Sequence, residues 1–253
     1  MDHIKAIGFD LFNTLIIAEA GALDEAMRRL ITGLAQNGVC PEIEPFHQAY
    51  REAALGFIRR AAQDGVETHN RFWISAALKG MGYAIEPDDP RISSAVESYF
   101  SAFFDYCHPI PGTHAMLETL RGSYRLGLLS NFTHAPAALK LIELLGLEDF
   151  FEVVLISGEM GFRKPHPLVF DKLAGSLGVD GGEMLYVGDD AEADIGGALS
   201  AGIRPVWFTY ARNLKSPLPL GAASDPVEIP GSTVPEISTW SELFSLLEQA
   251  RPL

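Results

Sequence analysis

The sequence predicts an α/β protein with a parallel core sheet and an inserted helical domain. An apolar run that ends at Asp10 indicates a buried strand near the N-terminus. About a hundred residues with helical periodicity follow this strand. The second half of the chain then alternates short apolar runs with helical segments, which is the pattern of βαβ units. We therefore expect the first strand and the second half of the chain to share one sheet, with the helical block inserted between them.

Each element follows from local periodicity and from breaks rich in Gly, Pro and Asp. The helical domain is predicted at 16–109 and the core domain at 1–15 and 110–253. Inside the helical domain we expect no strands, and the helices are predicted at 23–34, 46–63, 72–78 and 92–104. After the first strand, core strands are predicted at 126–129, 153–156, 184–187 and 206–208. Core helices are predicted at 113–120, 137–145, 167–177, 195–201 and 240–249. The segment 211–235, rich in Pro, Gly and Ser, is predicted to be irregular.

The composition is that of a globular protein with an acidic surface. The 253 residues are 47% hydrophobic, which is enough for one large core and a smaller second one. The net charge is −14 and no Lys/Arg cluster offsets it, which argues against a nucleic-acid or membrane-surface partner. Asp10 interrupts the first apolar run, so this run is neither a signal peptide nor a membrane span. We therefore expect a cytoplasmic location.

Asp10 is the first candidate site residue. A charge without a partner is costly to bury, so its carboxylate should emerge at the C-terminal edge of the strand, where open α/β sheets bind ligands. Asn13 and Thr14 favour a sharp exit from the strand, because Asn tolerates a positive φ and the Thr hydroxyl can stabilise a turn. Asp10 is therefore a candidate nucleophile or metal ligand. The alternative is an Asp that only caps a turn.

Other predicted element boundaries also carry polar groups. Ser130 and Asn131 follow a predicted strand and can present hydroxyl and N–H groups to an anion. Lys164 precedes a predicted helix, where it would add a fixed cation to a site that already favours anions. Residues 189–194 place three Asp and one Glu after another strand, and such hard oxygen ligands suit Mg²⁺. The alternatives are an ordinary turn, a solvated lysine and a solvated acidic turn.

The order of these motifs is the most specific signal in the chain. Asp10, Ser130, Lys164 and the acids Asp189 and Asp194 each follow a predicted strand, and their order and spacing resemble the haloacid dehalogenase-like (HAD) hydrolase superfamily. The resemblance covers the whole chain, since the helical block between the first two motifs looks like the family's C1-type cap. It implies a Rossmann-like parallel sheet core with an inserted all-helical cap domain.

The resemblance also implies roles for the matched positions. Asp10 matches the nucleophilic aspartate, which forms an aspartyl-phosphate in phosphatases and an aspartyl ester in dehalogenases. Thr14 matches the threonine of the same loop. Ser130, with Asn131 beside it, matches the hydroxyl that binds the transferring group. Lys164 matches the cation that orients and neutralises the nucleophile and the substrate.

A magnesium site is implied by the same comparison. In the Mg²⁺-dependent members the metal is held by the first aspartate, by the backbone carbonyl two residues later and by the acid of the fourth motif. These positions are Asp10, Phe12 and Asp189 in this chain. Asp194 would contribute through a water molecule.

Phe12 is also where the chain departs from the phosphatase pattern. Phosphatases of the family usually carry a second Asp there as general acid and base, whereas haloacid dehalogenases carry a non-acidic, often aromatic, residue. However, dehalogenases usually lack the acids that this chain keeps at Asp189 and Asp194. Without a cation these acids would repel Asp10 and a carboxylate substrate. A dehalogenase would also need a positive clamp, for which Arg51 or Arg71 is available.

We therefore favour Mg²⁺-dependent phosphoryl transfer to an active-site Asp and hydrolysis of a small phosphorylated metabolite. One alternative is a 2-haloacid dehalogenase. Another is a catalytically weak protein that binds phosphate esters or regulates a partner. The expected partner is a small-molecule phosphate ester.

Several aromatic residues and one histidine are open to two interpretations. Tyr50, Phe72 and Trp73 are candidates for the inner face of the cap, although aromatics at helical spacing are more often core residues. Four further aromatics are predicted to lie in the cap core: Tyr99, Phe100, Phe103 and Phe104. His134 is predicted to be an ordinary residue at a helix start, with a proton donor as the alternative.

Overall fold

The computed structural model describes residues 3–214 and 234–249, and its centre is a six-stranded sheet. The strand order is β5-β4-β1-β6-β7-β8, and every pair of neighbours is parallel. The strands are β1 (Ala6–Phe9), β4 (Arg125–Ser130), β5 (Val153–Ile156), β6 (Met184–Gly188), β7 (Arg204–Phe208) and β8 (Glu236–Ile237). The predicted α/β class and its parallel sheet are confirmed.

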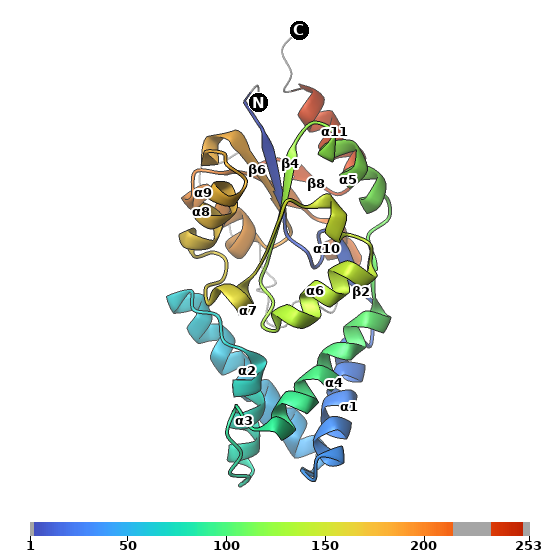
Figure 1. The fold of residues 1–253 in the computed structure, drawn as a ribbon, viewed down its shortest axis with the longest axis vertical. Helices are drawn as coiled ribbons and strands as arrows, with labels where there is room; N and C mark the ends of the chain where they lie inside the picture. The colour runs from blue at the N-terminus through green and yellow to red at the C-terminus, as the bar shows by residue number, and fades with distance from the viewer. Residues whose placement is uncertain (1–2, 215–233, 250–253) are drawn as a thin grey trace.

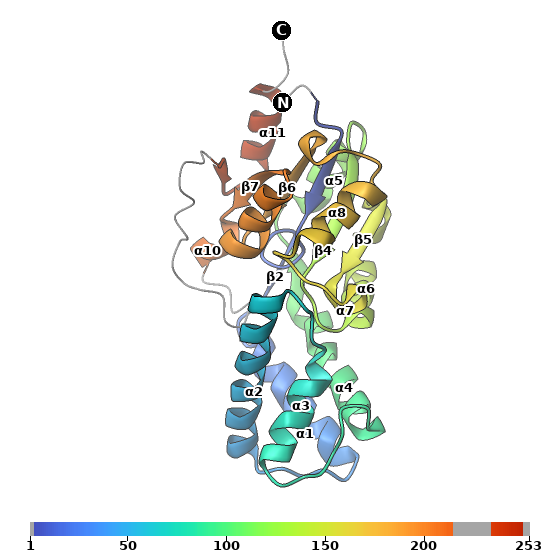
Figure 2. The ribbon, with the colours of Figure 1, turned by 90° about the vertical axis from the view of Figure 1, so that its left-hand side faces the viewer.

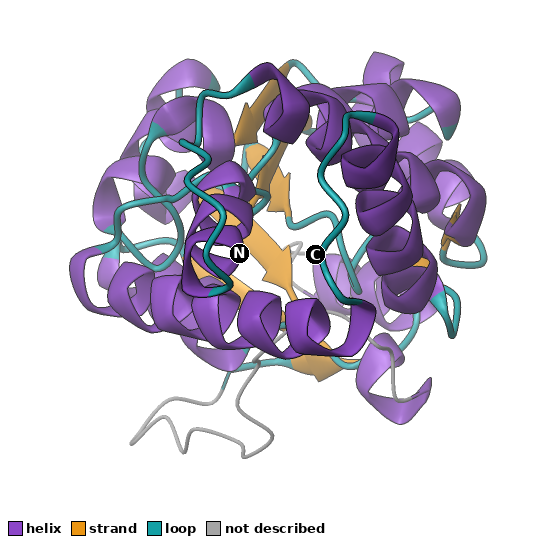
Figure 3. Cartoon of the chain, turned by 90° about the horizontal axis from the view of Figure 1, so that it is seen from below, coloured by secondary structure: helices purple, strands orange, loops and turns teal. Residues whose placement is uncertain are grey.

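Helices cover both faces of this sheet, as Figure 3 shows. One face packs against α8 (Pro167–Ser176) and α9 (Gly197–Ser200), while α5 (Thr113–Arg121) and α11 (Trp240–Gln249) lie on the other (Figure 1). Side chains alternate between the two faces along each strand. Phe9 therefore packs in the core between the sheet and the α5/α11 layer, whereas its neighbour Gly8 faces α8. A Cβ at Gly8 would lie 2.5 Å from Met184 Cε, so only glycine lets this layer pack so closely.

A group of four helices, the cap helices, lies at the end of the molecule opposite the two termini (Figure 1). They are α1 (Ala22–Gln36), α2 (Ile43–Asp64), α3 (Asn70–Gly80) and α4 (Pro90–Tyr106). α1 packs along α4, and α2 packs along α3 (Figure 2). The helices predicted for this block are confirmed, with ends that lie a few residues outside the predicted ones. The division of the chain into two domains at 16 and 110 stays a prediction.

The chain passes between the sheet and the cap helices through a short antiparallel ribbon. The ribbon pairs β2 (Ile16–Ala18) with β3 (Cys107–Pro109). The prediction of no strands within 16–109 is therefore wrong. Both strands have three residues, which is too short for a period of two to be recognised in the sequence.

The remaining helices are short. They are α6 (Ala135–Leu144), α7 (Ser157–Met160) and α10 (Tyr210–Leu214), with 3₁₀ turns at Glu148–Phe150 and Gly181–Glu183. The helix predicted at 195–201 begins earlier, as a π-helical segment over Ala191–Gly196 that leads into α9. The irregular segment predicted at 211–235 starts inside α10, and residues 215–233 lie outside the described residues. No helix in the described parts of the chain has both the length and the hydropathy of a membrane-spanning segment.

Candidate active site

The sheet brings the predicted site residues to one edge. β1 is flanked by β4 and β6, with Phe9 paired to Leu128 on one side and to Val187 on the other. Asp10, Ser130 and Asp189 therefore follow or end three adjacent parallel strands. In such a sheet the strands' carboxyl ends meet, and that edge is where the connections leave room for a ligand.

Asp10 leaves the sheet through the sharp turn that the sequence predicts. Asn13 is the one non-glycine residue with positive φ, at 61°, among the described residues. Its N–H donates to the carbonyl of Ile16 at 2.7 Å, which closes the loop. Thr14 is fully buried, and its hydroxyl makes no hydrogen bond to any described group. A buried hydroxyl without a partner is costly, so Thr14 Oγ1 is available to a water molecule or a ligand.

Lys164 lies between two carboxylates and is the most constrained charge of the site. Its side chain is 2% exposed, and its Nζ lies 2.5 Å from Asp10 Oδ1 and 2.7 Å from Asp194 Oδ1. Although burial works to lower it, the two carboxylates raise the pKa of Lys164 well above its usual value. The ammonium group therefore stays charged. The predicted juxtaposition of Asp10 and Lys164 is present in the structure.

Neighbouring polar groups fix the position of this lysine. Asn131 donates from Nδ2 to the carbonyl of Lys164 at 2.9 Å and accepts from the Lys164 N–H at 2.8 Å. Lys164 Nζ also donates to Tyr186 Oη and to the Leu129 carbonyl, both at 3.0 Å. Tyr186 is absent from the predicted site, because in the sequence it is one more apolar residue of a buried strand. Ser130 is buried at the end of β4, beside Asn131.

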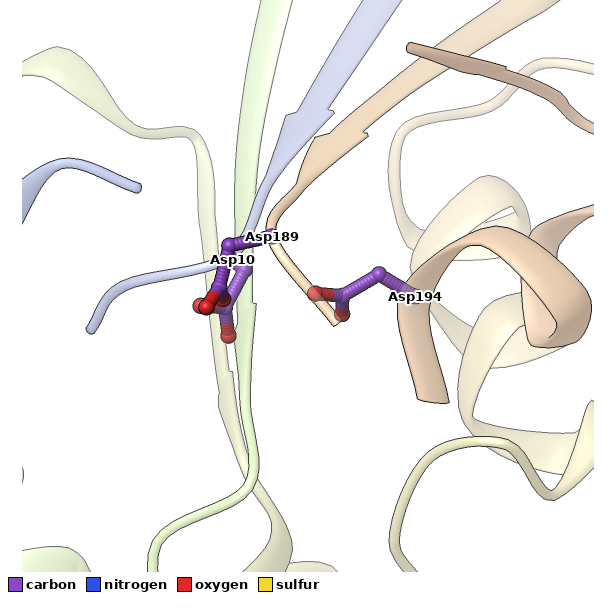
Figure 4. A group of neighbouring side chains, drawn as sticks. All are labelled: Asp10, Asp189 and Asp194. Atoms are coloured by element: carbon purple, nitrogen blue, oxygen red, sulfur yellow. The ribbon is translucent and has the colours of Figure 1, made fainter. Parts of the chain in front are cut away.

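Asp10, Asp189 and Asp194 form a compact acidic group (Figure 4). One oxygen from each carboxylate lies within 4.8 Å of the others. Burial, together with the charges of Asp10 and Asp194, raises the pKa of Asp189 well above its usual value. Lys164 is the one cation in contact with this group among the described residues, so three carboxylates face a single positive charge. The donor set therefore fits a divalent cation with oxygen ligands.

Asp194 is held by the protein through both of its oxygens. Its Oδ2 accepts the Asp190 N–H at 2.9 Å, while Oδ1 faces Lys164. Asp190 in turn caps the π-helical segment by accepting from the N–H groups of Glu192 and Ala193. A Cβ at Gly188 would overlap the Asp194 carboxylate, so glycine is required there. Burial raises the pKa of Asp194 to about 7. These contacts leave Asp189 the more accessible metal ligand of the two.

Phe12 places an aromatic ring at the position for which the resemblance to phosphatases leads one to expect a second acid. Its ring stacks on Phe132 with centroids 5.2 Å apart and meets the edge of Phe103 at 6.1 Å. The side chain thus packs between the loop after β4 and the cap helix α4. It contributes no proton donor.

A cavity of about 150 Å³ opens between the core loops and the cap helices. Its core side includes Phe12, Asn131 and Phe132, and its cap side includes Tyr50 and Trp73. The inner-face interpretation of Tyr50 and Trp73 therefore agrees with the structure, whereas Phe72 is exposed and is not among the lining residues. Tyr99, Phe100 and Phe103 are buried in the hydrophobic core, as predicted, and they also line the cavity, while Phe104 packs against the same core.

The cap and the core are also joined by hydrogen bonds near the site. Glu67, in the loop between α2 and α3, accepts from Ser157 Oγ at 2.6 Å and pairs with Arg163 at 3.3 Å. The backbones of Glu67 and Gly161 are hydrogen-bonded, as are those of Arg163 and Gly65. Cap residues are therefore fixed directly to the segment that precedes Lys164.

His134, at the N-cap of α6, is part of a second link between cap and core. His69 Nδ1 accepts the Arg71 N–H, so its Nε2 carries the proton that is donated to His134 Nδ1 at 2.9 Å. His134 Nε2 then donates to Glu97 at 2.9 Å. Both ring nitrogens of His134 are therefore engaged, and the structure supports a structural role over the proton-donor alternative.

Neither arginine proposed as a carboxylate clamp faces the acidic group. Arg51 is exposed on α2, and Arg71 pairs with Asp88 at 3.0 Å. Arg163 lines the cavity, but Glu67 already neutralises it.

Known proteins share both the sequence pattern and the fold. A family model for haloacid dehalogenase-like hydrolases matches residues 4–202. The glyceraldehyde 3-phosphate phosphatase of Pyrococcus abyssi (strain GE5 / Orsay) is 32% identical over 211 residues, which cover 83% of this chain and 83% of that protein. The N-acylneuraminate-9-phosphatase of Mus musculus is 36% identical over 251 residues, or 91% and 94% of the two chains. The 2-haloacid dehalogenase structure from Pseudomonas syringae pv. Tomato DC3000 has a TM-score of 0.67 and 26% identity over 98% of this chain and 100% of that one.

The matched segment contains every candidate site residue, from Asp10 to Asp194. The resemblance inferred from the motifs is confirmed, and the chain belongs to the haloacid dehalogenase-like hydrolase family of enzymes.

Proposed function

We propose that this enzyme is a Mg²⁺-dependent phosphatase that transfers the phosphoryl group of a small phosphate ester to Asp10. The observation that carries the proposal is the charge balance of the site, where three buried or half-buried carboxylates face Lys164 as the one cation among the described residues. That imbalance suits a divalent cation and a phosphoryl group together better than it suits a carboxylate substrate alone. The curated relatives are named as phosphatases, which supports the same conclusion.

In the proposed reaction a carboxylate oxygen of Asp10 attacks phosphorus and the bond to the leaving oxygen breaks. Lys164 orients Asp10 and stabilises the charge on the transferring group, and we assign Thr14 Oγ1 and Ser130 as hydrogen-bond donors to its oxygens. A water molecule then attacks the phosphorus of the aspartyl-phosphate, which releases inorganic phosphate and regenerates the carboxylate. Over the whole cycle one water molecule is consumed. Its hydroxyl group ends on the phosphate, and its proton ends on the leaving group.

The metal site is assigned to Asp10, Asp189 and the backbone carbonyl of Phe12, with Asp194 acting from the outer shell. Mg²⁺ bound there would neutralise charge on the phosphoryl oxygens. Asp194 supports this site indirectly, because its carboxylate holds Lys164 and the backbone of Asp190 in place.

A 2-haloacid dehalogenase is the second candidate, since Phe12 and the similarity to the Pseudomonas syringae enzyme favour it. The acidic group, the exposure of Arg51 and the pairing of Arg71 with Asp88 weigh against it. A binding protein without turnover remains as the third candidate, and the same experiment decides among the three.

The test is release of phosphate from acetyl phosphate and of chloride from 2-chloropropionate, each with Mg²⁺ and with EDTA. We expect phosphate release with Mg²⁺ only, and its loss in Asp10→Asn. Chloride release in EDTA would establish the dehalogenase. Phosphate-ester binding without either product would establish the binding protein.

A further inference from the structure

The cavity beside the site has the volume and the aromatic walls to hold a single ring. Its volume of about 150 Å³ is that of an apolar cavity that holds benzene. The side walls are aromatic rings from both parts of the molecule. Phe12 and Phe132 stack with an interplanar angle of 4° on the core side, and Phe100 and Phe103 from α4 pack around them. Such walls favour a planar, mostly apolar ligand group.

The cap end of this cavity carries buried polar atoms without partners. Asn70 is 1% exposed, and neither atom of its amide makes a hydrogen bond of good geometry to a described group. Tyr50 Oη and Trp73 Nε1 are buried in the same way, and all three residues line the cavity. The Tyr50 hydroxyl lies close enough to Tyr99 and Asn70 for a weak side-chain interaction with each, which leaves most of the polar capacity of the cluster unused. Buried polar groups normally have partners, so this cluster indicates a ligand that supplies them.

The core end of the cavity begins two residues after the nucleophile. Phe12 lines the cavity at this end, and its ring offers no proton to a leaving oxygen. A positioned acid accelerates such reactions roughly 10²- to 10⁴-fold, and it matters most when the leaving oxygen is strongly basic. A site without one suits a leaving group that is stable as an anion.

We propose that the substrate is an aryl phosphate monoester whose ring fills this cavity and whose phenolic oxygen is the leaving group. A substituent with one hydrogen-bond donor and one acceptor, on the ring side remote from the phosphate, contacts Asn70, Tyr50 and Trp73. This inference rests on the phosphatase function proposed above. An aryl phosphate explains both observations, the lack of a proton donor at Phe12 and the aromatic walls of the cavity.

The chemical step needs no further reactant. An oxygen of Asp10 forms a bond to phosphorus, and the bond between phosphorus and the phenolic oxygen breaks with its electron pair on that oxygen. The phenolate takes its proton from solvent after it leaves, and water hydrolyses the aspartyl-phosphate. A polyhydroxylated sugar phosphate fits the same cavity poorly, because most of its hydroxyl groups would face Phe12, Phe100, Phe103 and Phe132 without partners.

The first test compares phenyl phosphate with benzyl phosphate, which carries the same ring on an alkyl oxygen, and with acetyl phosphate, which has no ring. We expect kcat/KM for phenyl phosphate to exceed that for benzyl phosphate by at least about 100-fold. Equal values would overturn the proposal. Asp10-dependent turnover of acetyl phosphate alone would also overturn it, but would leave the phosphatase function standing.

The second test measures binding without turnover and therefore holds even if no ester is hydrolysed. Phenylphosphonate, 4-carbamoylphenylphosphonate and methylphosphonate are titrated in Mg²⁺ while tryptophan fluorescence is followed, since Trp73 lines the cavity. We expect phenylphosphonate to bind more tightly than methylphosphonate, and the carbamoyl group to add about tenfold. Phenylphosphonate that binds no better than methylphosphonate overturns the ring pocket, whatever the activity.

Asn70→Leu should abolish the preference for the carbamoyl ring, since leucine has a similar size and no polar atoms. Asn70→Asp serves as a second variant, because it keeps the shape and loses the donor. Asn37→Ala is the matched control: Asn37 lies at the end of α1, hydrogen-bonded to Gly33 and Ser94, away from the cavity. A carbamoyl preference that survives in both Asn70 variants, or that Asn37→Ala removes equally, would overturn the assignment of Asn70.

Discussion

Lys164 is expected to serve both the proposed catalysis and the stability of the fold. Replacing it with Met removes the cation that Asp10 and Asp194 share, so we expect kcat to fall at least about 10²-fold. The two buried carboxylates would then lack a partner, which costs about 3–5 kcal/mol. Their pKa values are already raised in the folded protein by burial, and loss of Lys164 raises them further.

The sign of the pH dependence follows from those raised pKa values. Carboxyl groups with a raised pKa bind more protons in the folded state than in the unfolded state, so stability is lost as pH rises through the folded pKa. In metal-free buffer we therefore expect the Tm of Lys164→Met to lie further below that of wild type at pH 8 than at pH 5.5. A variant with unchanged catalytic constants and a lower Tm at every pH would make Lys164 purely structural.

Asp189 and Asp194 should differ in their effect on Mg²⁺ affinity. The Asp194 oxygens already contact Lys164 and the Asp190 N–H, so in the proposed site Asp194 would act from the outer shell. We expect Asp194→Ala to raise the Kd for Mg²⁺ about 10- to 100-fold, as outer-shell changes do, and Asp189→Ala to raise it more. Calorimetric titration of Mg²⁺ measures both. The reverse order would exchange the two roles.

Phe12→Asp tests the missing general acid. The change removes two aromatic contacts, each contributing about 0.5–1.5 kcal/mol, so the variant should be less stable. If the loop tolerates this, the new carboxyl should accelerate benzyl phosphate selectively and leave acetyl phosphate, which needs little protonation, nearly unchanged. Rates are compared at saturating Mg²⁺, so that altered metal affinity does not enter. Equal acceleration of both substrates would argue against proton donation.

At the scale of elements, the loop between α2 and α3 joins the cap to the core through His69. Burial, assisted by the charges of His134 and Arg71, lowers the pKa of His69 to about 4. The folded state thus binds fewer protons than the unfolded state between about pH 4 and 6.5, and stability is lost as pH falls through that range. We expect Tm to fall more steeply between pH 7 and 5 in wild type than in His69→Gln.

The comparison with His69→Gln isolates the histidine, since the acidic group is present in both proteins. Identical pH profiles of Tm in the two proteins would mean that His69 does not titrate in this link. His108→Gln is the control, because His108 is half exposed and lies on β3, outside the link to His134.

Long, regular elements were predictable from the sequence, whereas short ones were not. The cap helices and β4 to β7 have enough residues for their periodicity to be recognised. β2, β3 and β8 have two or three residues each, and they exist only because a neighbouring strand pairs with them. The π-helical turn before α9 likewise reflects a tertiary demand, since it places Asp194 against Lys164.

At the scale of the whole molecule, the site residues also divide into those that the sequence predicts and those that only the tertiary structure reveals. The sequence predicted Asp10, Lys164, Asp189 and Asp194, because each stands at the end of a recognisable element and parallel strands end at a common edge. It did not indicate Tyr186, whose hydroxyl contacts Lys164 from within a buried strand. The residues that the cap contributes near the site could not be predicted from the sequence.

Glu67 lies in the loop between α2 and α3, His69 is the N-cap of α3, and Asn70 is its first residue. No local sequence motif identifies any of them. The partners of Glu67 and His69 lie 65 to 96 residues away along the chain, and Asn70 is marked only by its place in the lining of the cavity. Only the packing of cap on core gives these residues their roles, so a single sequence could not identify them.

The most direct measurement of the central claim is acid-quenched mass spectrometry of the enzyme during turnover of acetyl phosphate in Mg²⁺. Proteolysis of the quenched protein locates any added group. We predict the mass of one phosphoryl group on the peptide that contains Asp10, absent in EDTA and absent in Asp10→Asn. An unmodified Asp10 peptide during steady phosphate release, or a peptide that carries an ester derived from 2-chloropropionate in a parallel metal-free reaction, would contradict the account.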